Sequence, residues 1–170
     1  MASDKPGEAD NSEITLRPHR PGDIGWVIHR HGVLYAAEYN WDATFEAMVA
    51  KVAAGFIEDF RPGRDRCWIA ERDGQIVGAA FVVEASEMVA KLRMVYVEPG
   101  ERGNGLGRRL VREAMTFARI AKYNRMTLWT NDVLIAARAL YEREGFEKVS
   151  EQRYRGFGHE LTGETWERDL

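Results

Sequence analysis

The chain has 170 residues, of which 45% are hydrophobic and 30% carry a charged side chain, which suits one domain with a core of its own. The net charge of −3 argues against general binding to nucleic acid. No apolar run approaches the roughly 20 residues of a membrane span.

The N-terminal segment reads as a tail. Residues 1–12 are polar, contain Pro6 and Gly7 and show no periodicity. They lack the apolar stretch of a signal peptide. We therefore expect a disordered N-terminal tail over 1–12 and one domain over 13–170.

Two amphipathic helices are predicted after a short strand over Ile14–Arg17. The first helix has Asp23 as its N-cap and an apolar face from Ile24 to Tyr35. The second has Asp42 as its cap and an apolar face that ends at Phe60. One apolar face on each helix predicts that both helices cover a sheet.

Three antiparallel strands are predicted next, over Cys67–Glu71, Gln75–Glu84 and Lys91–Val97. The first two are joined by Asp73-Gly74, a dipeptide typical of tight hairpins. Gly78, inside the second strand, predicts a bulge or a close approach of another backbone.

The following elements alternate between helix and strand. A helix is predicted from Leu106 to about Lys122, then a strand over Arg125–Thr130, then a helix over Val133–Glu144 closed by Gly145. Because a strand–helix–strand crossover joins parallel strands, Arg125–Thr130 should run parallel to Lys91–Val97.

Two closing strands are predicted at the C-terminus, over Phe146–Tyr154 and Thr165–Leu170. We expect the three glycines between them to lie in a connecting loop: Gly156, Gly158 and Gly163. The complete pattern predicts an α/β architecture, a mixed sheet with helices on both faces.

The only cysteine of the chain, Cys67, cannot form an internal disulfide. A protein in a reducing cytoplasm is the expectation from such a composition. Cys67 is interpreted as a small core residue and not as a nucleophile. The histidines form no metal-ligand spacing, so no metal site is predicted.

A glycine-rich turn stands between the third strand and the long helix. Gly103, Gly105 and Gly107 remove Cβ atoms there, so that a ligand can approach the backbone amides. The helix N-terminus and the guanidinium groups of Arg102, Arg108 and Arg109 add positive charge, which suits a phosphate or pyrophosphate. Neither the Walker loop nor the dinucleotide fingerprint matches, and glycines alone are also compatible with an ordinary loop.

Two motifs carry a family resemblance. Arg102-Gly103-Asn104-Gly105-Leu106-Gly107 resembles the acyl-CoA-binding segment of the GNAT (Gcn5-related) N-acetyltransferases. Ala137-Arg138-Ala139-Leu140-Tyr141-Glu142-Arg143-Glu144-Gly145-Phe146 looks like that family's alanine, leucine-tyrosine and glycine-phenylalanine signature. The resemblance extends from Ile14 to Leu170 and implies the GNAT-like acyl-CoA N-acyltransferase fold, with a central, mostly antiparallel mixed sheet.

The chain is also similar to the acetyltransferase half of fusions that carry a winged-helix regulator in front. No such regulator fits within 1–12, so DNA binding is not expected.

The resemblance implies acetyl-CoA as cosubstrate and no metal. Cofactor-binding roles are implied for Val95, Tyr96, Val97, Arg102, Gly103, Asn104, Gly105, Leu106, Gly107, Arg108 and Asn131. Tyr141 matches the tyrosine that protonates the leaving thiolate, whereas its spacing alone is also compatible with core packing. Family members often carry asparagine seven residues before this tyrosine, where this chain has Leu134.

The acceptor side is less defined by the sequence. Tyr35, Glu38 and Arg93 are the substrate-site candidates. No general base is identified; Glu84, Glu87, Glu38, His31 or a water chain are the alternatives. Acidic groups would suit a cationic amine, whereas Arg93 would suit a carboxylate.

The implied function is transfer of an acetyl group from acetyl-CoA to a primary amine of a small molecule or a protein, by direct attack. The alternative is a non-catalytic sensor of the same fold that binds CoA or another ligand. Transfer to an oxygen acceptor is a third option that needs a strong base. Neither nucleic acid nor membrane is expected as a partner, and a homodimer is left open.

Overall fold

The computed structural model of the protein describes residues 13–170, so the tail predicted over 1–12 lies outside the described residues. In chain order the elements are β1 (Thr15–Arg17), α1 (Asp23–Tyr39), α2 (Ala43–Glu58), β2 (Arg66–Arg72), β3 (Gln75–Ser86), β4 (Val89–Val97), the 3₁₀ turn η1 (Pro99–Glu101), α3 (Leu106–Ile120), β5 (Arg125–Asn131), α4 (Ile135–Arg143), β6 (Glu147–Gly156) and β7 (His159–Asp169).

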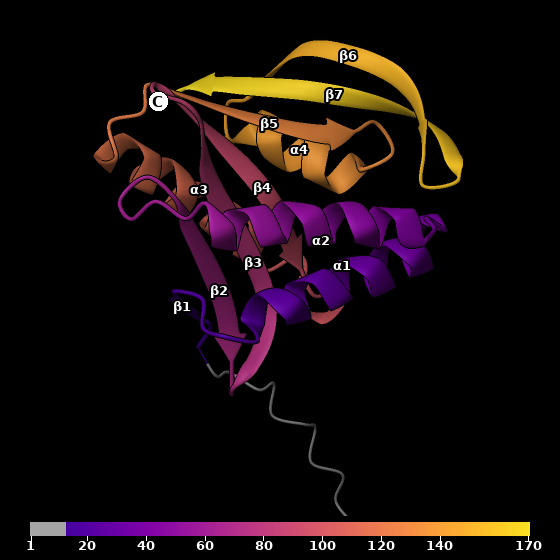
Figure 1. Ribbon diagram of the computed structural model, residues 1–170, viewed down its shortest axis with the longest axis horizontal. Helices are drawn as coiled ribbons and strands as arrows, with labels where there is room; N and C mark the ends of the chain where they lie inside the picture. Colours follow the sequence, from indigo (N-terminus) through magenta and orange to yellow (C-terminus); the bar gives the residue numbers. More distant parts are fainter. Residues whose placement is uncertain (1–12) are drawn as a thin grey trace, which may run out of the picture.

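The described strands form one seven-stranded sheet in the order β1-β2-β3-β4-β5-β7-β6 (Figure 1). All neighbouring pairs are antiparallel except β4 and β5, which run parallel. This confirms the predicted mixed, mostly antiparallel sheet and the predicted parallel pair around the crossover helix α3.

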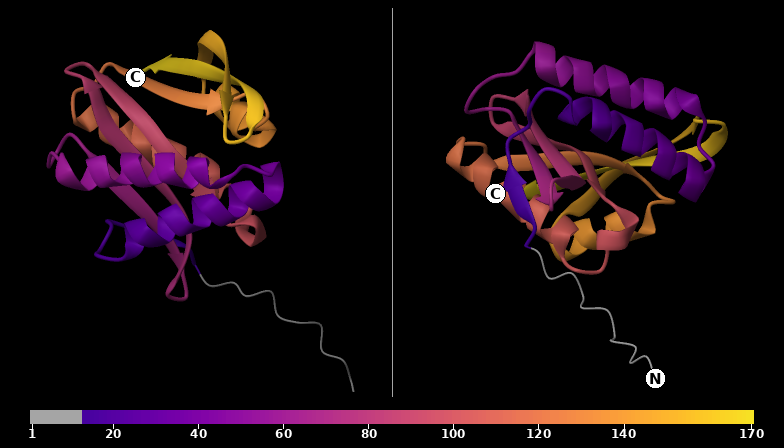
Figure 2. Two further views of the ribbon diagram at one scale, coloured as in Figure 1. Left: turned by 45° about the vertical axis from the view of Figure 1, so that its right-hand side comes forward. Right: turned by 90° about the horizontal axis from the view of Figure 1, so that it is seen from below.

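Helices cover the sheet on both faces, as Figure 2 shows from below. On one face α1 and α2 pack against β2, β3 and β4, with Val27, Phe56, Ile69 and Phe81 buried between them. On the other face α3 and α4 close a larger core that includes Leu110, Val111, Met115, Met126 and Trp166. Burial of these two apolar layers is the main stabilising contribution to the fold.

The predicted hairpin between β2 and β3 is confirmed. Asp73 and Gly74 both have positive φ, 50° and 75°, which the tight turn of a two-residue hairpin requires. At Gly78 the prediction is also confirmed, because the β2–β3 register shifts beside it and a Cβ there would lie 2.9 Å from the carbonyl oxygen of Tyr96.

The predicted loop between the last two strands is wrong. Only Phe157 and Gly158 turn the chain, with φ of 57° and 86°, and β7 already begins at His159. Gly163 lies inside β7, opposite Asn131, where an added Cβ would stand 2.6–2.8 Å from the indole of Trp129. The glycine therefore makes room for a ring on the neighbouring strand and does not form a turn.

Two of the predicted capping residues, Asp42 and Gly145, are confirmed. The predicted N-cap Asp23 is wrong: Gly22 is the N-cap of α1, and Asp23 is its first helical residue, whose carboxylate accepts hydrogen bonds from Arg17 and from the amide of Arg20. The Asp42 carboxylate accepts the amide hydrogen of Thr44 at 2.9 Å at the start of α2. Gly145 closes α4 with φ of 85°. The first helix runs to Tyr39, one turn further than predicted, and ends at Asn40 in the left-handed region.

Cys67 is buried under α1 and α2, which confirms its interpretation as a core residue. Burial raises the pKa of its thiol. Among residues 13–170 no cluster of His, Cys, Asp and Glu could hold a metal ion. In the same part of the chain no helix combines the length and the apolar content that are needed to cross a membrane.

Candidate active site

The sheet opens between β4 and β5. The two strands pair at only three positions, from Val89 to Lys91 on β4 and from Arg125 to Thr127 on β5. Beyond Lys91 the side of β4 that faces β5 has no strand partner within the described chain. Its backbone donors and acceptors are thus available to an extended ligand that carries amides.

A bulge in β4 lies at this opening. Arg93 pairs with Phe81 and Tyr96 pairs with Ala79, so Met94 and Val95 together stand opposite a single residue of β3. Met94 has a φ of 48°, which an unbranched L-residue adopts only when the surrounding structure holds it there. The sequence carries no local signal for this bulge, because the run Met94–Val97 reads as a regular strand.

The glycine turn has the open backbone that the sequence predicts at Gly103 and Gly105, but not at Gly107, where an added Cβ would lie 3.3 Å from the side chain of Leu140. Gly103 and Gly105 have φ of 83° and 82°, and an added Cβ would meet no atom within 4 Å at either position. Gly105 is the N-cap of α3 and provides no side-chain cap, so the first amides of the helix, Leu106 to Arg108, keep free hydrogens. These amides and the helix dipole form a cradle that fits a pyrophosphate.

The arginines beside the turn are engaged in ion pairs. Arg102 forms two hydrogen bonds to the Glu38 carboxylate at 2.8 and 3.0 Å, and this pairing raises the pKa of Arg102. Arg108 and Arg112 bind the buried Glu144 at 2.8 and 2.9 Å. Although burial opposes its charge, these arginines hold the pKa of Glu144 below the usual value. The amides are therefore the least committed anion-binding groups of the turn.

Two further ion pairs fix the chain that leads into the turn. Arg30 of α1 binds both carboxylate oxygens of Glu98, at 2.6 and 2.8 Å. Arg72 of β2 binds both oxygens of Glu101, at 2.9 and 3.0 Å. Paired hydrogen bonds of this kind fix orientation as well as distance, so the entry to the glycine turn is pre-organised.

Tyr141 of α4 lies in the core on the α3 side, with its ring edge on Phe146. Its hydroxyl makes no hydrogen bond to a described residue. Burial raises the pKa of Tyr141 to about 12, so the phenol keeps its proton throughout the physiological range.

Tyr35 of α1 approaches Tyr141 from the opposite face of the sheet. Burial raises the pKa of Tyr35, and the phenol of Tyr141 adds to that rise. The two tyrosines belong to different core clusters, one on each face of the sheet. The electrostatic influence of Tyr141 on Tyr35 is the link that the structure shows between these two sequence candidates.

Asn131 and Leu134 both make contacts within the protein itself. The Asn131 side-chain oxygen accepts the Tyr154 hydroxyl hydrogen at 2.6 Å, and its carbonyl accepts the amide hydrogen of Leu134 at 3.0 Å. Leu134 is buried beside Trp41 and Phe45. The leucine therefore packs against the turn between α1 and α2.

Three of the candidate bases have other partners. Glu84 pairs with Arg61 and Arg64, and hydrogen bonding to Arg64 is the main cause that lowers its pKa. Glu38 binds Arg102. His31 is 3% exposed with its Nδ1 on the carbonyl of Val27, and burial lowers its pKa to about 4. No structural observation favours Glu87.

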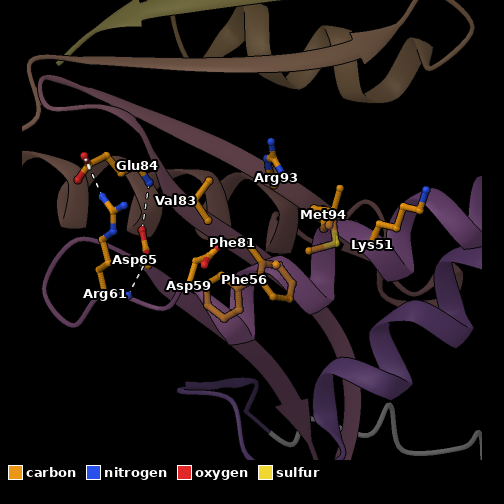
Figure 3. Close-up of a pocket in the computed structure, with 12 residues that line it drawn as sticks. Lys51, Phe56, Asp59, Arg61, Asp65, Phe81, Val83, Glu84, Arg93 and Met94 are labelled. Carbon is orange, nitrogen blue, oxygen red and sulfur yellow. Dashed lines mark hydrogen bonds and ion pairs between the residues drawn. The ribbon is translucent and has the colours of Figure 1, made fainter.

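A pocket of about 550 Å³ lies between α2 and the β3–β4 face of the sheet (Figure 3). Arg93 and Met94 line it, so it extends to the bulge in β4. Phe56, Phe81 and Val83 form its apolar wall. The sequence singles out Arg93, but nothing in it indicates that α2 contributes Lys51 to the same pocket.

Comparison with known proteins identifies the family. The profile described as "Acetyltransferase (GNAT) domain" matches residues 63–148, which include the glycine turn and Tyr141. The rat protein N-acetyltransferase family 8 member 3 is 30% identical over 124 residues, which are 69% of this chain and 54% of the relative. Human N-acetylaspartate synthetase is 40% identical over 84 residues, 48% of this chain and 28% of the relative.

The fold also resembles solved structures. The Salmonella typhimurium protein yncA, solved with its cofactor acetyl-CoA, superposes with a TM-score of 0.70 at 22% identity, over 92% of this chain and 94% of its own. At this identity the likeness concerns the fold alone. The chain spans about half the length, or less, of the two curated relatives named above.

Proposed function

This chain belongs to the GNAT acetyltransferase family, and we propose that it transfers an acetyl group from acetyl-CoA to a primary amine. The observation that carries the proposal is the parting of β4 and β5 directly beside the uncapped glycine turn. An extended amide-bearing arm and a pyrophosphate need those two features next to each other.

When bound, acetyl-CoA supplies a thioester whose acetyl carbon accepts the amine nitrogen, so that a C–N bond forms, the C–S bond breaks and CoA leaves as a thiol. The Gly103–Arg108 amides would hold the pyrophosphate. The open edge of Val95, Tyr96 and Val97 would pair with the pantetheine, and a backbone N–H near Val95 would donate a hydrogen bond to the thioester carbonyl oxygen.

Tyr141 donates the proton that the leaving sulfur requires. A phenol that keeps its proton up to high pH is a suitable acid for a thiolate with an ordinary pKa of about 8.5. The amine loses its proton to water, because the carboxylates of Glu38 and Glu84 are bound to arginines. Tyr141 then regains a proton from water, which closes the balance.

The acceptor is the less determined half of the reaction. Tyr35 and Glu38 come from α1, and Arg93 comes from β4. A homodimer and a cytoplasmic location are further proposals from composition, and nucleic acid is not proposed as a partner. The similarity to the acetyltransferase half of winged-helix fusions stays a prediction from the sequence.

Calorimetry with acetyl-CoA tests the binding half of the proposal. We expect Gly105→Glu to abolish binding, because it adds bulk and negative charge where the pyrophosphate belongs. Gly74→Glu is the matched control: it strains a glycine of similar positive φ in open space, but at the β2–β3 hairpin. Equal affinity of both variants and the wild type would show that the glycine turn is only a turn.

Thiol release against a panel of amines and peptides tests the transfer half. Turnover of any acceptor establishes the enzyme. Binding of acetyl-CoA without turnover across the panel would favour the sensor alternative, for which the arginine-bound carboxylates are the supporting observation.

A further inference from the structure

The pocket beside the β4 bulge contains a cation without a counter-ion. Arg93 lines the pocket and is only partly exposed, and no described residue forms a hydrogen bond or an ion pair with its guanidinium group. Arginine side chains that are partly removed from water normally have such a partner, since an unpaired donor loses its hydration without compensation.

Two lysines add to the positive charge. Lys51 of α2 lines the same pocket, and in Figure 3 it flanks Met94 from the side opposite to Arg93. Lys91 lies two residues before Arg93 on the same face of β4. Burial lowers the pKa of Lys91, and the charge of Arg93 lowers it further, so the two cations repel each other. An anion bound beside Arg93 would relieve that repulsion.

The acidic residues that line the pocket do not pair with Arg93. In Figure 3 Glu84 and Asp65 lie toward one end of the pocket, Met94 and Lys51 lie toward the other, and Asp59 lies between, beside Phe56. Asp65 accepts the amide hydrogens of Arg61 and Glu84, at 2.8 and 3.0 Å. Glu84 is bound by two arginines. Asp59 is therefore the acidic lining residue whose carboxylate has no described partner, and in Figure 3 it lies nearer to Asp65 than to Met94.

We propose that the acceptor is a free amino acid whose carboxylate binds Arg93, and this inference rests on the proposed function. Arg93 is adjacent in the chain to the bulge residue Met94, which stands where β4 and β5 part. An α-amine is two bonds from its carboxylate carbon, so anchoring the carboxylate at Arg93 brings the nitrogen to the open edge of β4. A volume of about 550 Å³ accommodates an amino acid with a large side chain.

The proposal excludes two other acceptor classes. A peptide N-terminus has a neutral amide in place of the carboxylate and leaves Arg93 unpaired. A polyamine brings further positive charge to a group of cations. Both should be poor acceptors.

Thiol release from acetyl-CoA tests the inference with matched acceptors: L-phenylalanine against phenethylamine and phenylalaninamide, and L-tryptophan against tryptamine. We expect the amino acids to be preferred. Arg93→Ala should raise the KM for amino acids about 10- to 100-fold, the effect of losing one charge-assisted hydrogen-bonded pair. The KM for acetyl-CoA should not change, and the preference for the amino acids over their decarboxylated amines should be lost.

Arg93→Lys should recover part of the loss, and Arg119→Ala is the control, an exposed arginine on α3 at the opposite face. Preference of the wild type for the decarboxylated amines would overturn the inference and leave the proposed function intact. An equal effect of Arg93→Ala on both acceptor classes would also overturn it.

A binding measurement decides the case in which no acceptor is turned over. N-acetyl-L-phenylalanine, titrated into protein saturated with CoA, should bind the wild type at least tenfold more tightly than Arg93→Ala. That result supports the inference, whereas the absence of turnover with every acceptor is what counts against transfer as the function. Absence of Arg93-dependent binding overturns the inference.

Discussion

The Tyr141 hydroxyl is a group that the fold does not need. It makes no hydrogen bond to a described residue, whereas its ring packs against Phe146. We therefore expect Tyr141→Phe to lower kcat about a hundredfold, as loss of a general acid typically does, and to leave acetyl-CoA affinity and the melting temperature unchanged. Steady-state kinetics and thermal unfolding check this. An unaltered kcat would remove Tyr141 from the mechanism.

His31 makes the stability of the protein depend on pH. Burial lowers its pKa from 6.5 to about 4, opposed only by the bond to the Val27 carbonyl. The unfolded chain binds a proton below pH 6.5 and the folded chain does not, so the free energy of unfolding falls as the pH drops from 6.5 to 4. The loss is about 3 kcal/mol at about 1.4 kcal/mol per pH unit.

Urea unfolding between pH 4 and 7 checks this expectation. His31→Gln should flatten the curve over that interval, whereas His29→Gln, which alters an exposed histidine of the same helix, should not. Parallel curves for His31→Gln and the wild type would contradict the assignment.

At the scale of elements, Gly163 fixes how β5 and β7 pack. An added Cβ would overlap the indole of Trp129, so the ring or the strand must move. We expect Gly163→Ala to destabilise the protein by about 1–3 kcal/mol, the usual cost of overpacking. A double-mutant cycle with Trp129→Ala checks the cause, since the penalty should largely disappear without the ring. A penalty of the same size in both backgrounds would point to a backbone effect.

The same glycine shows what local sequence can predict. Asp73-Gly74 and Gly145 act through their own φ angles, and the Asp42 cap acts within two residues, so these features were predicted correctly. Gly163 is required by Trp129, a residue 34 positions earlier, and no local pattern contains that relation.

In the candidate site, too, some features are predicted by local sequence and others depend on tertiary contacts. The glycine turn and Tyr141 belong to contiguous motifs and were found in the sequence. The left-handed Met94, the three-position pairing of β4 with β5 and the Glu38–Arg102 ion pair are set by tertiary contacts. They became visible only in the structure.

At the scale of the whole molecule, the two halves of the sheet are joined along a short ladder and by the core under α3. A ligand that pairs with the free edge of β4 should therefore add hydrogen bonds where the ladder between β4 and β5 ends, and so stabilise the contact between the two halves of the sheet. At 100 times its Kd, acetyl-CoA adds about 2.7 kcal/mol, so amide exchange governed by this opening should slow about 100-fold. Hydrogen exchange over Arg93–Val97, with the exposed edge strand β6 as internal control, checks this. Uniform protection of both segments would contradict it.

The reactivity of Cys67 can report a motion that a substrate assay does not measure, the separation of α1 and α2 from the sheet. It is the only thiol of the chain, 1% exposed beneath α1 and α2, and burial raises its pKa. A thiol reagent can reach the sulfur only when the layer formed by these two helices separates from β2. The rate of its modification then measures the lifetime of the closed core, and a cysteine introduced at the surface would be labelled selectively while Cys67 stays protected.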